Sequence, residues 1–259
     1  MMTMGGRFAR RTGGLALAAG LVFASAALAD DGALQQRIEA RLGKAGLADR
    51  GQVQVEVTNG VAVLSGFTTT VDAQRSAEKA ARKETKAVDN QLRIVPLARE
   101  DDEIRKAVAD AVLSDPRYGV FDSVGVGVDN GVVTLQGSVL DPWRKDEIDR
   151  RVARLDGVRE VRNEIRVQPA SPFDDRLRLE LYRRIYGNGL FQRYASFANP
   201  PIRIIVDHGN ITLAGVVNSR VEKVALESIA RGVLAFKVDN QVQVESEMGK
   251  EPKATTSSD

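Results

Sequence analysis

The chain has 259 residues, of which 43% are hydrophobic and 28% charged, and it contains no cysteine and one histidine. Without cysteine there is no disulfide, no thiolate metal site, no cysteine nucleophile and no acylated lipoprotein cysteine. A single histidine also argues against a histidine-based metal centre or a Ser/His/Asp triad. Most familiar hydrolytic chemistry is therefore disfavoured by composition alone.

Residues 1–29 are typical of a secretory signal peptide. Three arginines precede a short apolar run at 15–23, and Ala27-Leu28-Ala29 is an A-x-A cleavage signal. The run is shorter than the ~20 apolar residues that a membrane span needs, and a retained N-terminal anchor is the alternative. Removal of this segment changes the formal charge of the chain from +2 to −1, because it takes three of 37 basic residues and none of the 35 acidic ones. We expect an exported protein that is not a lipoprotein and has no global positive field to attract nucleic acid.

One pattern recurs three times after residue 29, at 53–66, 124–137 and 202–215. Each copy is a β-branched run, a turn rich in Asn and Gly, and a second β-rich run that ends in glycine. Asn and Gly accept the positive φ that tight hairpin turns require, so each copy predicts a β-hairpin. The recurring glycines are interpreted as structural, at the turn or where the second strand turns toward a helix: Gly60, Gly66, Gly131, Gly137, Gly209 and Gly215.

Helical periodicity precedes and follows every hairpin, and an alternating strand ends each unit. The helix before the third hairpin begins at Ser171-Pro172, a capping serine and a proline at the first helical position. In the helix after that hairpin, Val221, Val224, Ala225 and Ile229 recur at helical spacing.

The predicted fold class is therefore α+β: three tandem small α-β-β-α-β domains, each a three-stranded sheet with two helices packed on it. The predicted domains span 30–98, 99–169 and 170–246. The segment 247–259 has no apolar period and is predicted to be a disordered tail.

The repeated unit resembles the BON domain (bacterial OsmY and nodulation) over nearly all of residues 30–246. The resemblance rests on the Asn-Gly turns, the glycine after each second strand, and the V-x-N-x-[LIV] strands around Asn90, Asn163 and Asn240. It implies an exported, non-enzymatic envelope protein, similar to osmotically inducible periplasmic proteins, whose relatives are associated with phospholipid binding and envelope integrity. The third copy departs from the pattern at its Gly209-Asn210 turn and in its longer connector. The three asparagines are interpreted as local hydrogen-bonders at a helix-to-strand corner.

No motif supports catalysis, a cofactor or a metal. Gly125, Gly127 and Gly131 lie inside a hairpin, whereas a dinucleotide fingerprint must open a helix. His208 is a turn residue beside Asp207, and the carboxylates are scattered without a base beside them. We therefore predict no catalytic residue, no cofactor and no metal site.

Aromatic and arginine residues concentrate in 173–203, and no acidic residue lies between Glu180 and Asp207. At about 100° per residue, one helical stripe begins at Leu177 and a second, formed by Leu179, Tyr182 and Tyr186, lies on nearly the opposite side. The small sheet of this domain can cover only one stripe. The other stripe, with its flanking arginines, suits contact with phospholipid headgroups.

The patch thus predicts peripheral binding to a membrane surface of anionic phospholipid. The resemblance further implies that the chain is a non-enzymatic periplasmic protein that supports envelope integrity or osmotic-stress tolerance. The candidate contact residues are Leu179, Tyr182, Arg183, Arg184, Tyr186, Phe191, Arg193 and Tyr194. Two alternatives stay open. The second stripe packs against the first or second domain, or the patch binds an envelope protein or cell-wall polymer, since Tyr and Arg dominate such sites.

Overall fold

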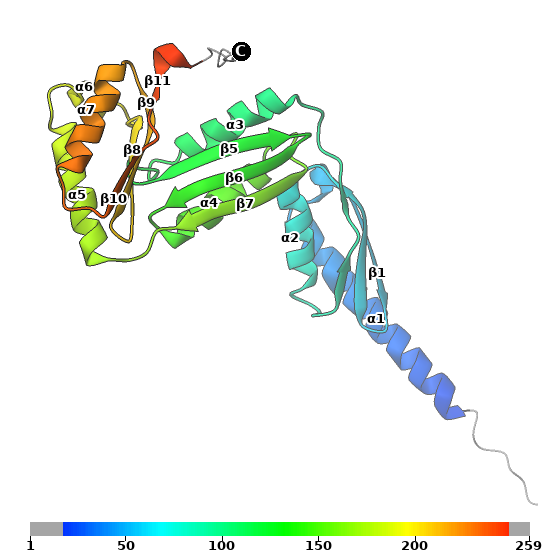
Figure 1. The fold of residues 1–259 in the computed structure, drawn as a ribbon. Coiled ribbons are helices and arrows are strands. Elements are labelled where there is room, and N and C mark those ends of the chain that lie inside the picture. The colour runs from blue at the N-terminus through cyan, green and yellow to red at the C-terminus, as the bar shows by residue number, and fades with distance from the viewer. Residues whose placement is uncertain (1–17, 249–259) are drawn as a thin grey trace, which may run out of the picture. The chain divides into compact units, whose positions relative to one another are not determined.

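The computed structural model describes residues 18–248, and these form two compact units (Figure 1). One unit contains the first repeat, up to Thr68 and over Ala73–Arg93; the other contains Thr69–Asp72 and the chain from Ile94 onward, with the second and third repeats. The predicted signal peptide lies largely outside the described residues, as does the predicted tail beyond Met248. None of the helices within 18–248 has both the length and the apolar content needed to cross a membrane.

The first repeat follows the predicted order, with its last strand split in two. Its elements are α1 (Ala18–Lys44), η1 (Ala48–Arg50), β1 (Gly51–Thr58), β2 (Val61–Thr68), α2 (Val71–Ala81), β3 (Val88–Asn90) and β4 (Arg93–Ile94). β2 is the central strand, antiparallel to β1 and parallel to β3. Ile38, Leu64 and Ala77 form the centre of its core, which joins both helices to the sheet.

The second and third repeats have the same topology. The second comprises α3 (Asp101–Leu113), β5 (Ser123–Asp129), β6 (Val132–Val139), α4 (Pro142–Ala153) and β7 (Glu160–Val167). The third comprises α5 (Pro172–Tyr186), α6 (Gln192–Ala195), β8 (Ile202–Asp207), β9 (Asn210–Val217), α7 (Arg220–Arg231), β10 (Lys237–Asn240), β11 (Gln243–Val244) and η2 (Glu245–Glu247). In each repeat the helix after the hairpin is the crossover that makes the last strand parallel to the central one. The predicted α+β class and the three α-β-β-α-β repeats are confirmed.

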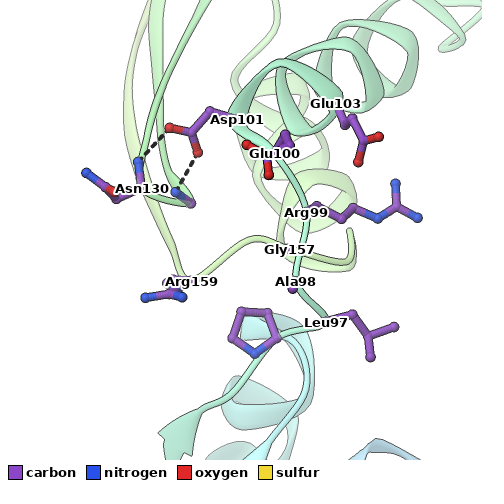
Figure 2. A pocket seen from close by; sticks show the side chains of 11 residues that line it. Leu97, Ala98, Arg99, Glu100, Asp101, Glu103, Asn130, Gly157 and Arg159 are labelled. Carbon is purple, nitrogen blue, oxygen red and sulfur yellow. Dashed lines mark hydrogen bonds between the residues drawn. The ribbon is translucent and has the colours of Figure 1, made fainter.

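Each hairpin turn is held by an aspartate from the preceding helix. In the second repeat, the Asp101 carboxylate accepts hydrogen bonds from the backbone N–H groups of Asn130 at 2.8 Å and Gly131 at 2.9 Å (Figure 2). Asp31 and Asp174 make the same pair of bonds in the first and third repeats. The turns need this partner because both central residues have positive φ, which points two adjacent N–H groups outward from the hairpin.

The glycines of the second strands lie inside those strands, which corrects the prediction that they mark a turn toward a helix. Gly66 pairs with the third residue of β1, Gly137 with the second residue of β5, and Gly215 with the first residue of β8. Gly215 has φ of 106°, and a Cβ there would overlap the carbonyl oxygen of Pro201. Glycine is therefore required by close backbone approach.

The three asparagines likewise lie in the last strand and not at a helix-to-strand corner. Asn163 donates through Nδ2 to the Lys145 carbonyl oxygen of α4 at 3.1 Å and accepts from the Ile165 N–H at 3.2 Å. Asn240 ties β10 to α7 in the same way, and Asn90 reaches a side chain of α2. The three asparagines form local hydrogen bonds, as predicted. The bonds that Nδ2 donates connect the last strand of each repeat to its crossover helix.

Candidate lipid-facing surface of the third repeat

Three of the predicted contact residues are interior, which corrects the prediction for them. Tyr186, Phe191 and Tyr194 belong to the core of the third repeat. The Tyr186 hydroxyl donates to the Ile202 carbonyl oxygen at 2.6 Å, and burial raises the pKa of this phenol. The chain between α5 and β8 folds back over its own sheet, so these rings are not at the surface.

Arg193 is engaged within the same repeat. Its guanidinium pairs with Glu222 of α7, whose other carboxylate oxygen accepts from the Tyr194 hydroxyl at 3.0 Å. Glu222 also completes a capping box with Ser219 at the start of α7. Because Glu222 is buried, the arginine neutralises a charge that would otherwise be costly there. Arg193 is thus a structural residue in this arrangement.

Tyr182 lies where the second and third repeats meet. Its ring centroid is 6.2 Å from that of Phe121, in the loop before β5, and 5.2 Å from that of Tyr186. The side chain nevertheless remains exposed to solvent over part of its surface. The alternative that the second stripe packs against another repeat is therefore realised at Tyr182, with the second repeat as the neighbour.

Leu179 is the exposed apolar residue at the centre of the outer face of α5. Arg176 and Arg183 lie three residues before and four residues after it, and therefore on the same face. Within residues 18–248 neither arginine has a carboxylate at ion-pair distance. Arg184 differs, because it pairs with Glu180 at 2.6 Å and donates to a backbone carbonyl at the end of α7.

The outer face of α7 continues this surface, because α5 and α7 pack against each other on one face of the sheet (Figure 1). Val221 is 71% exposed and Val224 61%, while the buried side of α7 is formed by Glu222, Leu226 and Ala230. The helix predicted from the spacing of Val221, Val224, Ala225 and Ile229 is present as α7, but the two valines face solvent while Ala225 and Ile229 are partly buried. A comparison between the repeats could have predicted that the two valines face solvent, because α2 carries Asp72 and Arg75 at the corresponding positions.

A further apolar feature, missed by the sequence prediction, follows α7. Leu234 and Phe236 are 82% and 81% exposed, the highest values of any large hydrophobic side chain described. The Phe236 N–H donates to the Gly209 carbonyl oxygen at 2.9 Å, and its ring stacks on Phe173 at 6.1 Å between centroids. In the second repeat Arg159 makes the same backbone bond to the turn glycine, so a basic residue stands where this repeat has an aromatic one.

We name six exposed residues of α5 and α7 the helix-layer surface: Arg176, Leu179, Tyr182, Arg183, Val221 and Val224. Neighbouring acids on the two helices are engaged: Asp175 with Arg178 at 2.6 Å, and Glu227 with Arg231 at 2.7 Å. The surface therefore combines apolar side chains with unpaired positive charge, an arrangement suited to an interface between water and a lipid headgroup layer.

The histidine and the acidic side chains elsewhere in the described chain form no metal site. His208 is a positive-φ turn residue whose Nδ1 lies 2.5 Å from Asp207 Oδ1, and its ring points to solvent. In the described part of the chain, no three His, Asp or Glu side chains are gathered to hold a metal ion. A hollow of about 550 Å³ lies beside the Asp101 turn and is lined by both acidic and basic side chains (Figure 2).

Comparisons with known proteins place these observations in a family. The model of the BON domain matches residues 30–96, 100–169 and 189–246. The third match begins after α5, so this helix lies outside it. No curated protein matches the chain.

Among solved structures, the chain is similar to two of CdsD, a structural protein of the Type III secretion system of Chlamydia trachomatis. The one of its C-terminal domain is 12% identical, with a TM-score of 0.25, and the match covers 81% of this chain and 96% of that chain. The other is 11% identical, with a TM-score of 0.24, and covers 84% and 98%. TM-scores this low do not bear on function. The family match extends over most of the chain in three segments, and the protein belongs to the BON domain family.

Proposed function

We propose that the protein binds anionic phospholipid peripherally in the periplasm, through the helix-layer surface of the third repeat, and so supports envelope integrity or osmotic-stress tolerance. BON domains are associated with phospholipid binding and with osmotic-stress proteins, and the family is generally non-catalytic. The proposal assigns that association to one surface of this chain.

The observation that carries the proposal is the composition of the outer faces of α5 and α7. Leu179, Val221 and Val224 are exposed there, while Arg176 and Arg183 have no ion-pair partner in the described part of the chain. The corresponding helices of the second repeat expose mainly charged side chains, such as Asp102 and Glu103. The third repeat is therefore better suited than the second to meet a membrane.

The expected attachment is reversible. A Lys or Arg side chain near an anionic membrane surface contributes on the order of 1 kcal/mol, and the contribution is screened within a Debye length. Burying a few aliphatic side chains at the interface adds about 25 cal/mol for each Å² removed from water. These terms support a salt-sensitive peripheral association and are too small for permanent anchoring.

Vesicle flotation of the chain from residue 30 onward tests the proposal. We expect flotation with vesicles of phosphatidylcholine and phosphatidylglycerol at low salt, and little with phosphatidylcholine alone. The double variant R176Q/R183Q should bind about 30-fold more weakly, the equivalent of about 2 kcal/mol. R93Q/R166Q removes two exposed arginines from strand regions and serves as the matched control, with binding unchanged.

Absence of flotation with both vesicle types at low salt would reject the proposal. Equal loss in R93Q/R166Q would reject the assigned surface, because binding would then depend on net charge alone. If the protein instead captures cell-wall polymer or an envelope protein without lipid, and this capture is lost in R176Q/R183Q, the surface is a docking site and the lipid assignment is wrong.

A further inference from the structure

The first repeat contains a basic hollow between its two helices, unrelated to the helix-layer surface of the third repeat. It measures about 340 Å³ and lies at the C-terminal ends of α1 and α2. Four cationic side chains line it, Arg41 and Lys44 from α1, and Lys79 and Lys83 from α2 and the turn after it. No carboxylate is among the lining residues.

In the part of the chain that the structure describes, the three lysines of this hollow have no ion-pair partner. Arg41 pairs with Glu84, and this hydrogen bond lowers the pKa of the Glu84 carboxyl. Lys44, Lys79 and Lys83, by contrast, have no carboxylate within 4.0 Å in the described part of the chain. Three positive charges thus surround one hollow, and none of them is paired with a carboxylate among the described residues.

The partial negative charges at the C-terminal ends of α1 and α2 compensate only part of this positive charge. Each helix C-terminus carries about half a negative charge, so the two ends compensate about one of the three lysines. Lys79, on α2, and Lys83, in the turn after it, both line the hollow. One residue earlier, Glu78 and Arg82 form an ion pair at 2.7 Å. Lys79 and Lys83 thus lie on the side that lines the hollow, and the paired Glu78 and Arg82 lie beside it.

The remaining lining is small and polar enough to admit an anion. Ser76 is half-buried, precedes Lys79 by three residues, and offers a hydroxyl donor on the same side of α2. Ala45 and Ala80 fill little of the space. Ammonium groups converging with a hydroxyl donor are suited to a phosphate group, with Lys acting as a point charge.

We propose that this lysine hollow binds the phosphate group of a small anionic ligand, either a phosphodiester lipid headgroup or a free phosphate ester. Lys44, Lys79 and Lys83 would neutralise the phosphate oxygens, and Ser76 would donate a hydrogen bond to one of them. The site does not depend on the proposed function of the third repeat, because it lies in the other compact unit.

A titration of the chain from residue 30 onward with glycerol 3-phosphate and with inorganic phosphate, followed by ¹H–¹⁵N amide shifts, tests the site. We expect saturable shifts at residues 44–45 and 76–83, beyond those produced by sodium chloride at matched ionic strength. K79Q/K83Q should weaken binding about tenfold or more. K86Q/K106Q removes two exposed lysines outside the hollow and should leave the affinity unchanged.

Vesicles containing phosphatidylglycerol distinguish the two sources of the phosphate. If K79Q/K83Q lowers vesicle binding while R176Q/R183Q lowers it independently, the hollow takes a lipid headgroup. If K79Q/K83Q weakens only the soluble ligands, it takes a free phosphate ester. Shifts no larger than those in sodium chloride, or equal shifts in K79Q/K83Q, would overturn the proposal whatever the outcome for the third repeat.

Discussion

Arg203 of β8 donates a hydrogen bond from Nη1 to the carbonyl oxygen of Gly119 in the second repeat, at 2.9 Å. Its guanidinium carbon lies 4.8 Å from the centroid of the Tyr118 ring. Beside it, the Ile204 N–H donates to the Val120 carbonyl oxygen at 2.7 Å, and Val120 is buried in the core of the third repeat. A loop of the second repeat thus covers the edge of β8, which explains why these two repeats form one compact unit.

Truncation of this arginine should loosen the junction. R203A removes a charge-assisted hydrogen bond and leaves the Gly119 carbonyl without that donor, so we expect a loss of about 1–3 kcal/mol in the free energy of unfolding. Urea unfolding measures the loss, and hydrogen exchange at the Ile204 amide should become faster. R220A, at an exposed arginine of α7, is the control. Unchanged exchange at Ile204 in R203A would show that the arginine does not secure the junction.

The turn-holding aspartates should matter most where they are buried. D174N keeps the size of a fully buried side chain but replaces one accepting oxygen with an NH₂ group facing the N–H groups of His208 and Gly209. We expect a loss of about 1–3 kcal/mol in unfolding free energy, measured by chemical denaturation. D101N changes the same contact at a partly exposed position and should cost less. An equal or larger loss in D101N would contradict the role given to burial.

Backbone crowding predicts the effect of alanine at the strand glycines. G215A places a Cβ against the Pro201 carbonyl oxygen at φ of 106°, so it should destabilise the third repeat by about 2–4 kcal/mol or prevent its folding. G189A, where no atom lies within 4 Å of the added methyl group, should change stability by less than about 1 kcal/mol. Thermal denaturation followed by circular dichroism compares the two. Equal melting temperatures would contradict this account.

The apolar half of the helix-layer surface can be tested separately from its arginines. V221S/V224S should reduce flotation with phosphatidylglycerol vesicles about tenfold, because two aliphatic side chains no longer enter the interface. Stability should stay nearly unchanged, since both valines are exposed. V95S/L97S alters two exposed apolar residues outside the third repeat and should bind as the unmodified chain does. Undiminished binding by V221S/V224S would remove α7 from the proposed surface.

Acid should weaken the second repeat through Asp115. Burial, the largest single influence, raises the pKa of this carboxyl, but the hydrogen bonds from Arg117 and the charge of Arg151 together hold the pKa below its ordinary value. A lowered folded-state pKa means that the carboxylate stabilises the fold above about pH 4 and loses this effect as the pH falls through the folded value. D115N should therefore flatten the decline in unfolding free energy below pH 4. An unchanged pH profile would contradict this assignment.

The sequence predicted most of the fold because hairpins and helices follow from local chemistry. Asn59-Gly60 and Asn130-Gly131 adopt the positive φ that tight turns need wherever they occur, and periodic apolar positions identify a helix before its partners are known. The aspartates that hold the turns were missed, because Asp101 and Gly131 are brought together only by folding.

The candidate site was predicted less well, and for the same reason. The helical spacing of Leu179, Tyr182 and Tyr186 showed that α5 has apolar residues outside the stripe that begins at Leu177. It could not show that Tyr186 hydrogen-bonds within its own repeat while Tyr182 meets Phe121. Exposure depends on what the rest of the chain leaves uncovered, and a helical wheel contains no information about that.

By itself, therefore, the sequence determined three α-β-β-α-β units and the glycines that their strands and turns require. Tertiary structure alone decided which side chains reach the surface, leaving Val221 and Val224 in water and enclosing Phe191 and Tyr194. The physical reason is the range of the interactions: backbone conformation is set within a few residues, whereas burial is set by contacts between segments that are distant in the sequence.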